Sequence, residues 1–146
     1  MSNAYRELRK QQQAEFDKFP LGAAFNNEQF KEMMEKWGLK EKDTDKILSL
    51  GAGAFIRKAD KEAYLEMNRR HTAQLKEAIA ADETGEGFIY EMFYHELANH
   101  EYGYTGDLED TLDALGYTAE EINADERLLR GLNKAADEIM NHDCFD

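Results

Sequence analysis

The feature that most restricts the fold of this chain is its low content of β-branched residues. Its 146 residues contain no Val, six Ile and six Thr, whereas Ala, Leu, Met, Glu and Lys are plentiful. Val, Ile and Thr favour strands, and the abundant residues favour helices. The single proline, Pro20, leaves room for long uninterrupted helices. We therefore predict an all-α fold.

Apolar periodicity and cap residues predict about six or seven helices in one compact domain that spans residues 1–146. The helices are expected at about 3–18, 27–37, 42–50, 61–81, 88–102, 107–115 and 125–141, with one further turn that begins at Thr118. A chain of 146 residues is long enough to bury a core. The residues expected in or beside this core are Trp37, Met34, Phe93, Leu97, Leu112 and Leu129.

The connections between the expected helices carry recognisable cap sequences. Two pairs of residues have capping-box spacing: Asn26 with Gln29, and Thr118 with Glu121. Gly38 and Gly116 each follow an amphipathic segment, so both are expected to be left-handed caps within helix–Gly–helix hairpins. Phe55 and Ile56 resemble a short strand, but no other segment resembles its partner.

Charge is distributed unevenly along the chain. Residues 1–73 hold 14 Lys and Arg against 12 Asp and Glu, whereas residues 74–146 hold 4 against 19, a net charge of −15. Between Lys76 and Arg127 there is no Lys or Arg at all, although fifteen Asp and Glu occur there. This asymmetry disfavours direct binding to nucleic acid or to an anionic membrane.

The acidic half instead predicts a partner-binding surface. Carboxylates spaced at one per helical turn imitate the periodic charge of a nucleic-acid backbone and can dock onto a basic cleft. We expect a non-enzymatic protein whose partner is a protein with a basic surface. The candidate partner-binding residues are Glu91, Glu96, Glu101, Asp107, Glu109, Asp110 and Asp113.

A second hypothesis uses the aromatic residues of the same region. Residues 88–104 form the densest aromatic run of the chain. If some of these rings are exposed, the protein is a general interaction module in which apolar contacts matter more than charge. The candidates for this role are Tyr90, Tyr94, Tyr102 and Tyr104.

A third hypothesis is a metal-dependent hydrolase built on the region of His95, Glu96 and His100. The two histidines are five residues apart, which places them about 140° apart around a helix. The zinc-protease helix signature requires a spacing of four, so that both rings face one metal ion. We therefore expect no metal, no other cofactor and no catalytic residue.

Cellular location is predicted from cysteine use and hydropathy. The lone Cys144 allows no intrachain disulfide, which favours a reducing compartment. No apolar run approaches the roughly 18 residues that span a bilayer, and no apolar signal segment begins the chain. A soluble, cytoplasmic protein is expected.

Five phrases carry a resemblance to a known family: Asp43-Thr-Asp-Lys-Ile47, Gly51-Ala-Gly-Ala-Phe55, Thr84-Gly-Glu-Gly-Phe-Ile-Tyr-Glu-Met-Phe93, Glu96-Leu-Ala-Asn-His-Glu101 and Asp110-Thr-Leu-Asp-Ala-Leu-Gly116. Over roughly residues 5–140 the chain resembles an uncharacterised family of small acidic proteins carried on bacterial conjugative and phage-like elements. The resemblance implies no activity, cofactor or catalytic residue. It implies a setting in which small acidic proteins often block host restriction or CRISPR machinery by imitating DNA.

Overall fold

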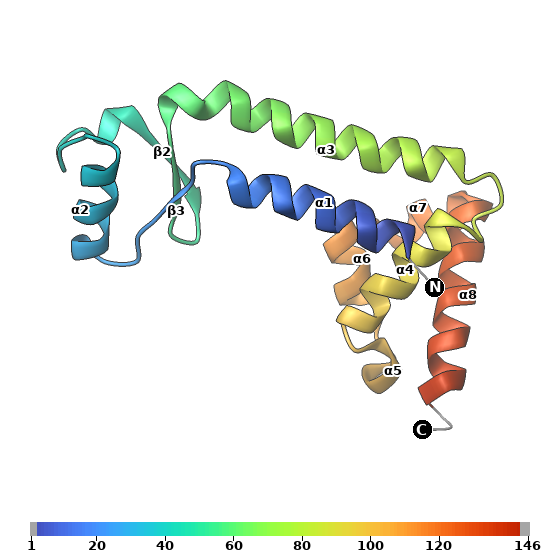
Figure 1. The fold of residues 1–146 in the computed structure, drawn as a ribbon. Coiled ribbons are helices and arrows are strands. Elements are labelled where there is room, and N and C mark those ends of the chain that lie inside the picture. The colour runs from blue at the N-terminus through green and yellow to red at the C-terminus, as the bar shows by residue number, and fades with distance from the viewer. Residues whose placement is uncertain (1–2, 144–146) are drawn as a thin grey trace. The chain divides into compact units, whose positions relative to one another are not determined.

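The computed structural model describes residues 3–143, the last two of them by their backbone alone (Figure 1). Cys144, the lone cysteine for which no intrachain disulfide is predicted, lies outside these residues. The described chain is mainly helical and also contains a small sheet. Its elements are α1 (Ala4–Lys18), β1 (Gly22–Ala23), α2 (Asn27–Lys36), η1 (Thr44–Lys46), β2 (Ile47–Gly51), β3 (Ala54–Arg57), η2 (Lys58–Asp60), α3 (Lys61–Ala81), α4 (Phe88–Asn99), α5 (Tyr102–Thr105), α6 (Glu109–Leu115), α7 (Ala119–Ala124) and α8 (Glu126–Asp143).

The sheet corrects the all-α prediction and the helix expected at 42–50. Its strands are antiparallel in the order β1-β3-β2, so that Phe55 pairs with Gly22 on one side and with Ser49 on the other. Gly51, Ala52 and Gly53 all have positive φ, of 89°, 51° and 80°, and reverse the chain within two residues. Because this turn joins two apolar segments, Ile47–Gly51 becomes a strand instead of a helix.

Contacts divide the chain into two compact units. The acidic unit comprises the residues up to Gln12 and those from Ala73 onward, and the sheet unit comprises Gln13–Thr72. The boundaries fall inside α1 and α3. The single domain expected over residues 1–146 stays a prediction, and each unit is described by itself below.

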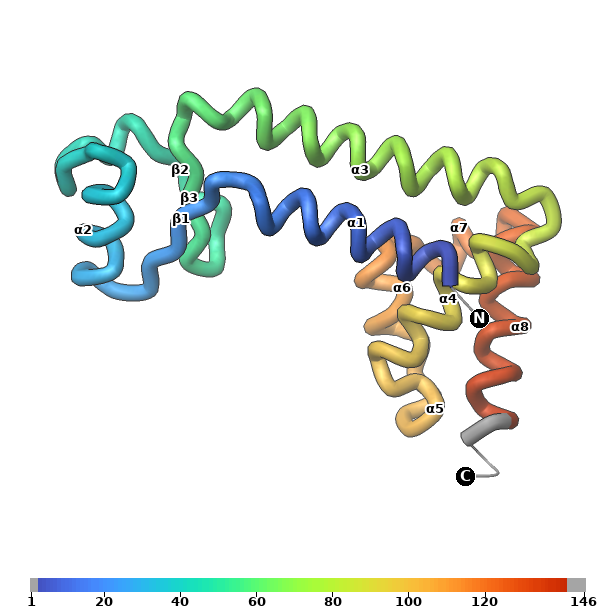
Figure 2. The backbone as a smooth tube through the Cα atoms, viewed as in Figure 1, coloured from blue at the N-terminus to red at the C-terminus, as the bar shows by residue number. Residues whose placement is uncertain are grey.

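The core of the acidic unit lies between α4 and α8, which run side by side (Figure 2). A Cβ on Gly131 would lie 2.6 Å from the carbonyl oxygen of Gly85 and 2.7 Å from the Cγ2 of Ile89, so glycine permits this close approach. The buried apolar residues are Tyr5, Ile89, Met92, Phe93, Leu97, Ile122, Leu128, Leu132, Ala135 and Ile139. Leu112 and Leu129 pack against them as predicted, and Phe93 and Leu97 are fully buried.

The sheet unit has a smaller core between α2 and the sheet. Its buried residues are Ala24, Met33, Met34 and Ile47, with Phe30, Trp37, Leu39 and Phe55 packed against them. The predicted positions of Met34 and Trp37 are therefore confirmed. A Cβ on Gly22 would lie 2.7 Å from the indole of Trp37, so the glycine of β1 allows α2 to pack closely on the sheet.

The predicted helix caps are confirmed. The Asn26 side chain accepts the N–H of Gln29 at 2.8 Å, and Thr118 and Glu121 form a complete capping box. At the end of α2, Leu39 N–H donates to the carbonyl of Met34 at 2.8 Å, which is the bond of a Schellman motif. Tyr117 makes the same bond to Leu112 after α6. Only the second motif leads into another helix, α7, because η1 and β2 follow the first.

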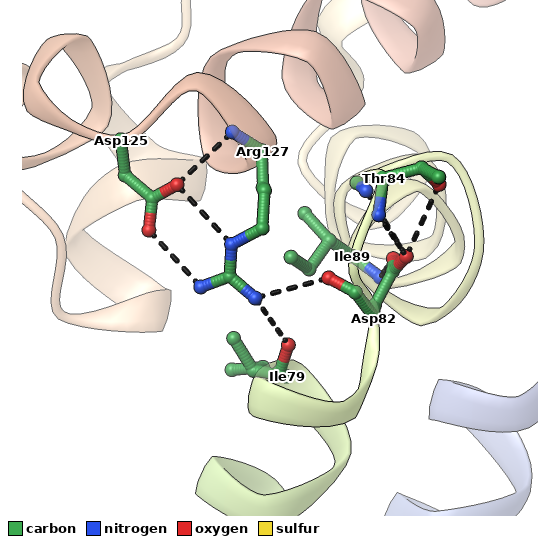
Figure 3. A network of polar contacts seen from close by, with 7 residues as sticks. Ile79, Asp82, Thr84, Ile89, Asp125 and Arg127 are labelled. Atoms are coloured by element: carbon green, nitrogen blue, oxygen red, sulfur yellow. Dashed lines mark hydrogen bonds and ion pairs between the residues drawn. The ribbon is translucent and has the colours of Figure 1, made fainter.

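The loop before α4 is held by polar contacts within the acidic unit (Figure 3). The Asp82 carboxylate accepts the N–H groups of Gly85, Gly87 and Ile89, each at 3.0 Å. Burial raises the pKa of Asp82, but these N–H donors together outweigh it and hold the pKa below its usual value. Arg127 donates to the carbonyl oxygens of Ile79 and Asp82 and thereby ties the loop to α8.

The aromatic helix is shorter than predicted. α4 ends at Asn99, and Glu101 has a left-handed φ of 57° that starts the one-turn helix α5 in a new direction. The chain is helical again from Tyr102 to Thr105, beyond residue 102, where the predicted helix ends. Across the described part of the chain, no helix combines the length and apolar character needed to cross a membrane.

Candidate acidic binding surface

Net charge lies entirely in the acidic unit. That unit holds 20 Asp and Glu against 7 Lys and Arg, whereas the sheet unit holds 11 of each. Within the described part of the acidic unit, Asp125 with Arg127 is the one ion pair between a carboxylate and an Arg or Lys. Most of its carboxylates therefore have no cation beside them.

Two of the seven predicted partner-binding residues are engaged with the start of α1. The Glu91 carboxylate accepts the N–H of Ala4, and the side chain of Asn3 donates to the Glu91 carbonyl at 2.9 Å. A carboxylate at this position stabilises the N-terminus of α1 through the helix dipole. Glu91 is half-buried, and its carboxylate accepts this one hydrogen bond inside the unit.

Glu96 is the second engaged residue. Its Oε1 accepts the hydroxyl of buried Tyr5 at 3.0 Å, and its Oε2 lies 3.5 Å from the Nε2 of His100. Burial and the neighbouring Glu96 charge raise the pKa of Tyr5. Only 15% of the Glu96 side chain is exposed, which leaves little of it for a partner.

The other five predicted residues are all exposed. They are Glu101, Asp107, Glu109, Asp110 and Asp113, which follow one another from the start of α5 to the middle of α6. Asp107 accepts the N–H of Glu109 at 2.9 Å. The carboxylates of the other four make no hydrogen bond or ion pair with any described residue. We call these five residues the acidic surface.

The basic residues nearest in sequence to the acidic surface are engaged elsewhere. Arg127 pairs with Asp125 at 3.1 Å, a contact that lowers the pKa of Asp125. Arg130 donates to the carbonyl of Thr84 at 3.0 Å, and the Lys134 ammonium lies 4.5 Å from the centre of the Tyr90 ring. The positions of these cations depend on tertiary contacts and carry no sequence signal.

The side chains of the hydrolase hypothesis do not converge. The Nε2 of His95 lies 3.2 Å from the Nδ2 of Asn99, and its ring packs on Tyr5 with centroids 5.6 Å apart. His100 faces Glu96 instead. Nowhere in the described residues do three His, Cys, Asp or Glu side chains lie where they can hold one metal ion.

The four candidate tyrosines fall into two groups. Tyr90, Tyr94 and Tyr102 are half-buried and pack against the core of the acidic unit. Tyr104, in contrast, is 92% exposed. The exposed-aromatic hypothesis therefore rests on Tyr104 alone among these four residues.

Two hollows, both in the sheet unit, contain none of the predicted site residues. One, of about 430 Å³, is lined by Lys31, Glu35, Leu39, Lys40, Glu41 and Lys42. The other, of about 320 Å³, lies between β1 and α2 and includes Trp37 and Met33. Both are lined by a mixture of charged and apolar groups.

Fold and surface together define a mainly helical protein with a small antiparallel sheet and a strongly acidic unit. The chain belongs to DUF7659, a family of unknown function whose sequence model matches residues 4–138. The predicted membership of an uncharacterised family is thus confirmed, and the link to mobile elements stays a prediction. A search of curated proteins and a search of solved structures each found no match.

Proposed function

We propose that this protein acts by binding and has no catalytic role. Its acidic surface engages a basic groove on a protein that handles DNA or RNA. The observation that carries the proposal is the division of charge, with −13 on the acidic unit and zero on the sheet unit. Unpaired carboxylates attract a basic partner over a long range and speed its association.

The acidic surface is the part of the unit best suited to this contact. Its five side chains are exposed, whereas Glu91 and Glu96 are used to hold α1. Burying carboxylates is costly unless the partner offers paired donors. A partner rich in arginine meets this requirement, because a guanidinium can donate two parallel hydrogen bonds to one carboxylate.

A DNA-mimic or anti-defence role is the form of this proposal that we favour. Carboxylates with no interleaved cation present the same sign of charge as a phosphate backbone. The resemblance to small acidic proteins of conjugative and phage-like elements supports this setting. The protein then works in the cytoplasm and contacts neither nucleic acid nor membrane directly.

The test compares two variants that lose the same number of charges. In the first, the acidic surface is changed to amides (Glu101→Gln, Asp107→Asn, Glu109→Gln, Asp110→Asn and Asp113→Asn). In the matched control, five exposed acids of the sheet unit are changed (Glu28→Gln, Glu32→Gln, Glu35→Gln, Glu41→Gln and Asp45→Asn). Each immobilised protein captures partners from a bacterial lysate at about 0.05 M and about 0.5 M salt, where screening differs strongly.

The unmodified protein and the control are expected to retain the same nucleic-acid-handling protein at low salt and to release it at high salt. The acidic-surface variant is expected to lose it at both. Capture of the same partner by the acidic-surface variant, with unchanged salt dependence, would show that the proposed function is wrong.

A further inference from the structure

Three aromatic rings of the described chain share one arrangement. Each has a cation over the ring and a carboxylate that bonds the cation or the ring hydroxyl: Tyr90 with Lys134 and Glu138, Trp37 with Arg57 and Asp60, and Tyr5 with Arg9 and Glu96. The cation lies 4.5, 5.9 and 6.0 Å from the ring centre in these three sets. All three distances lie within the range of a cation–π contact.

Tyr104 has an exposed ring and two acidic residues close to it in sequence. Its ring is 92% exposed, and its N–H bonds the carbonyl of Glu101 one turn earlier, at 2.9 Å. Asp107 follows three residues later, and both carboxylates are exposed. Within the described chain, no cation lies over the Tyr104 ring. The ring and its flanking acids are therefore open to a cation from another molecule.

The neighbouring sequence supplies no such cation. No Lys or Arg occurs between residues 77 and 126. The next basic residues, Arg127, Arg130 and Lys134, are held by Asp125, by the Thr84 carbonyl and by the Tyr90 ring.

Met140 adds an apolar contact beside this position. Its side chain is 36% exposed, and its methyl carbon lies 3.9 Å from where a Cβ on Gly106 would be. Gly106 follows Tyr104 by two residues, so the thioether borders the turn that carries the exposed ring. A flexible thioether adapts readily to the methylene stem of a long side chain.

We propose that Tyr104 receives an arginine of the basic protein partner. The guanidinium stacks on the ring, Glu101 or Asp107 accepts its paired hydrogen bonds, and its stem packs on Met140. Arginine fits better than lysine because its planar group can stack and can bond a carboxylate bidentately. This inference rests on the proposed function and adds to it a contact residue and a side-chain preference.

The test measures binding of two fluorescent peptides of equal length, one of arginine only and one of lysine only, by anisotropy at low salt. The full-length protein is expected to prefer the arginine peptide by about two- to fivefold, the size of an exposed cation–π contact. Tyr104→Leu should reduce this preference, because only the bidentate bonds to the carboxylates then favour arginine, and Tyr104→Phe should keep it in full. Phe25→Leu is the matched control, because Phe25 is an aromatic residue 76% exposed on the neutral sheet unit.

The outcomes separate this inference from the proposed function. If Tyr104→Leu leaves the arginine preference unchanged while amides on the acidic surface weaken the binding of both peptides, the proposed tyrosine contact is wrong. The proposed role of the acidic surface is then still supported. If amides on the acidic surface weaken the binding of neither peptide, the proposed function is wrong, and this inference is wrong with it. Circular dichroism of each variant checks that it is folded.

Discussion

At the scale of single residues, the carboxylates of this chain divide into those that organise the fold and those that face water. Asp82 accepts backbone N–H groups of the loop before α4 and of Ile89 in α4. Glu91 and Glu96 accept hydrogen bonds from Ala4 and Tyr5 at the start of α1. Within the acidic surface, Asp107 accepts the N–H of Glu109, and the other four carboxylates make no hydrogen bond or ion pair with any described residue. This division explains why two of the seven predicted contact residues are poor candidates for a partner, although all seven are acidic and near each other in sequence.

Glu15 gives a prediction of pH dependence for the sheet unit. Hydrogen bonds from Arg70 and His71 lower its pKa from 4.5 to about 2. Because the folded-state pKa is depressed, the stabilisation is complete above about pH 4.5 and disappears as the pH falls to about 2. The urea midpoint of the unmodified protein, followed by Trp37 fluorescence, should fall as the pH is lowered from about 4.5 to about 2. In Glu15→Gln this fall should be smaller.

A double-mutant comparison controls this prediction. Arg70→Gln should also reduce the fall of the urea midpoint at low pH. The double variant should reduce it little further than either single change. If the urea midpoint of Glu15→Gln falls with pH as steeply as that of the unmodified protein, the paired carboxylate does not contribute to acid unfolding.

At the scale of elements, the hairpin of β2 and β3 is the part that departs most from the sequence prediction. Its two-residue turn places Ala52 at φ 51° and Gly53 at φ 80°. A tight hairpin turn requires positive φ at both positions, and alanine adopts it less readily than glycine. The hairpin therefore forms despite an unfavourable residue at its turn.

Ala52→Gly is accordingly expected to stabilise the sheet unit by about 1 kcal/mol, because glycine adopts the left-handed conformation without a steric penalty. Ala54→Gly is the matched control. Ala54 pairs with Ala23 in the sheet, and glycine inside a strand should destabilise by about 0.5–1 kcal/mol. Both are measured by urea unfolding with Trp37 as the probe. A loss of stability in Ala52→Gly would contradict the assigned turn.

At the scale of the whole molecule, the two units differ strongly in net charge. Like charges on a folded unit repel one another and destabilise it, and salt screens this repulsion. The acidic unit carries −13, whereas the sheet unit is neutral. The same residues that suit the acidic unit to a basic partner therefore reduce its stability at low salt.

Raising salt from about 0.01 M to about 0.15 M shortens the screening length from about 30 Å to about 8 Å. Hydrogen exchange in α4 and α8 should become slower over this range, because screening relieves the repulsion. Exchange in β2 and β3 should change much less, and these strands are the internal control. Equal slowing in both units would show that repulsion within the acidic unit does not limit its stability.

Features that depend on local chemistry could be predicted from the amino-acid sequence. Apolar periodicity located α1, α2, α3 and α8, and capping residues such as Asn26 and Thr118 marked helix starts because their bonds span only three residues. Composition predicted an all-α chain, which is right for most of the chain but misses the three-stranded sheet. The division of charge along the chain was also visible, because it requires only counting.

Features that depend on residues far apart in the sequence could be seen only in the folded structure. Ile47–Gly51 is apolar enough for a helix, and it is a strand because β3 pairs with it after a tight turn. From the sequence, Glu91 and Glu96 are predicted to be surface acids. In the structure they bond Ala4 and Tyr5 of α1, which lie some ninety residues earlier in the chain. Tyr104 differs from Tyr90 because no cation of the described residues lies over its ring, whereas Lys134 lies over Tyr90. Sequence spacing cannot show any of these contacts, because each joins residues that only folding brings together.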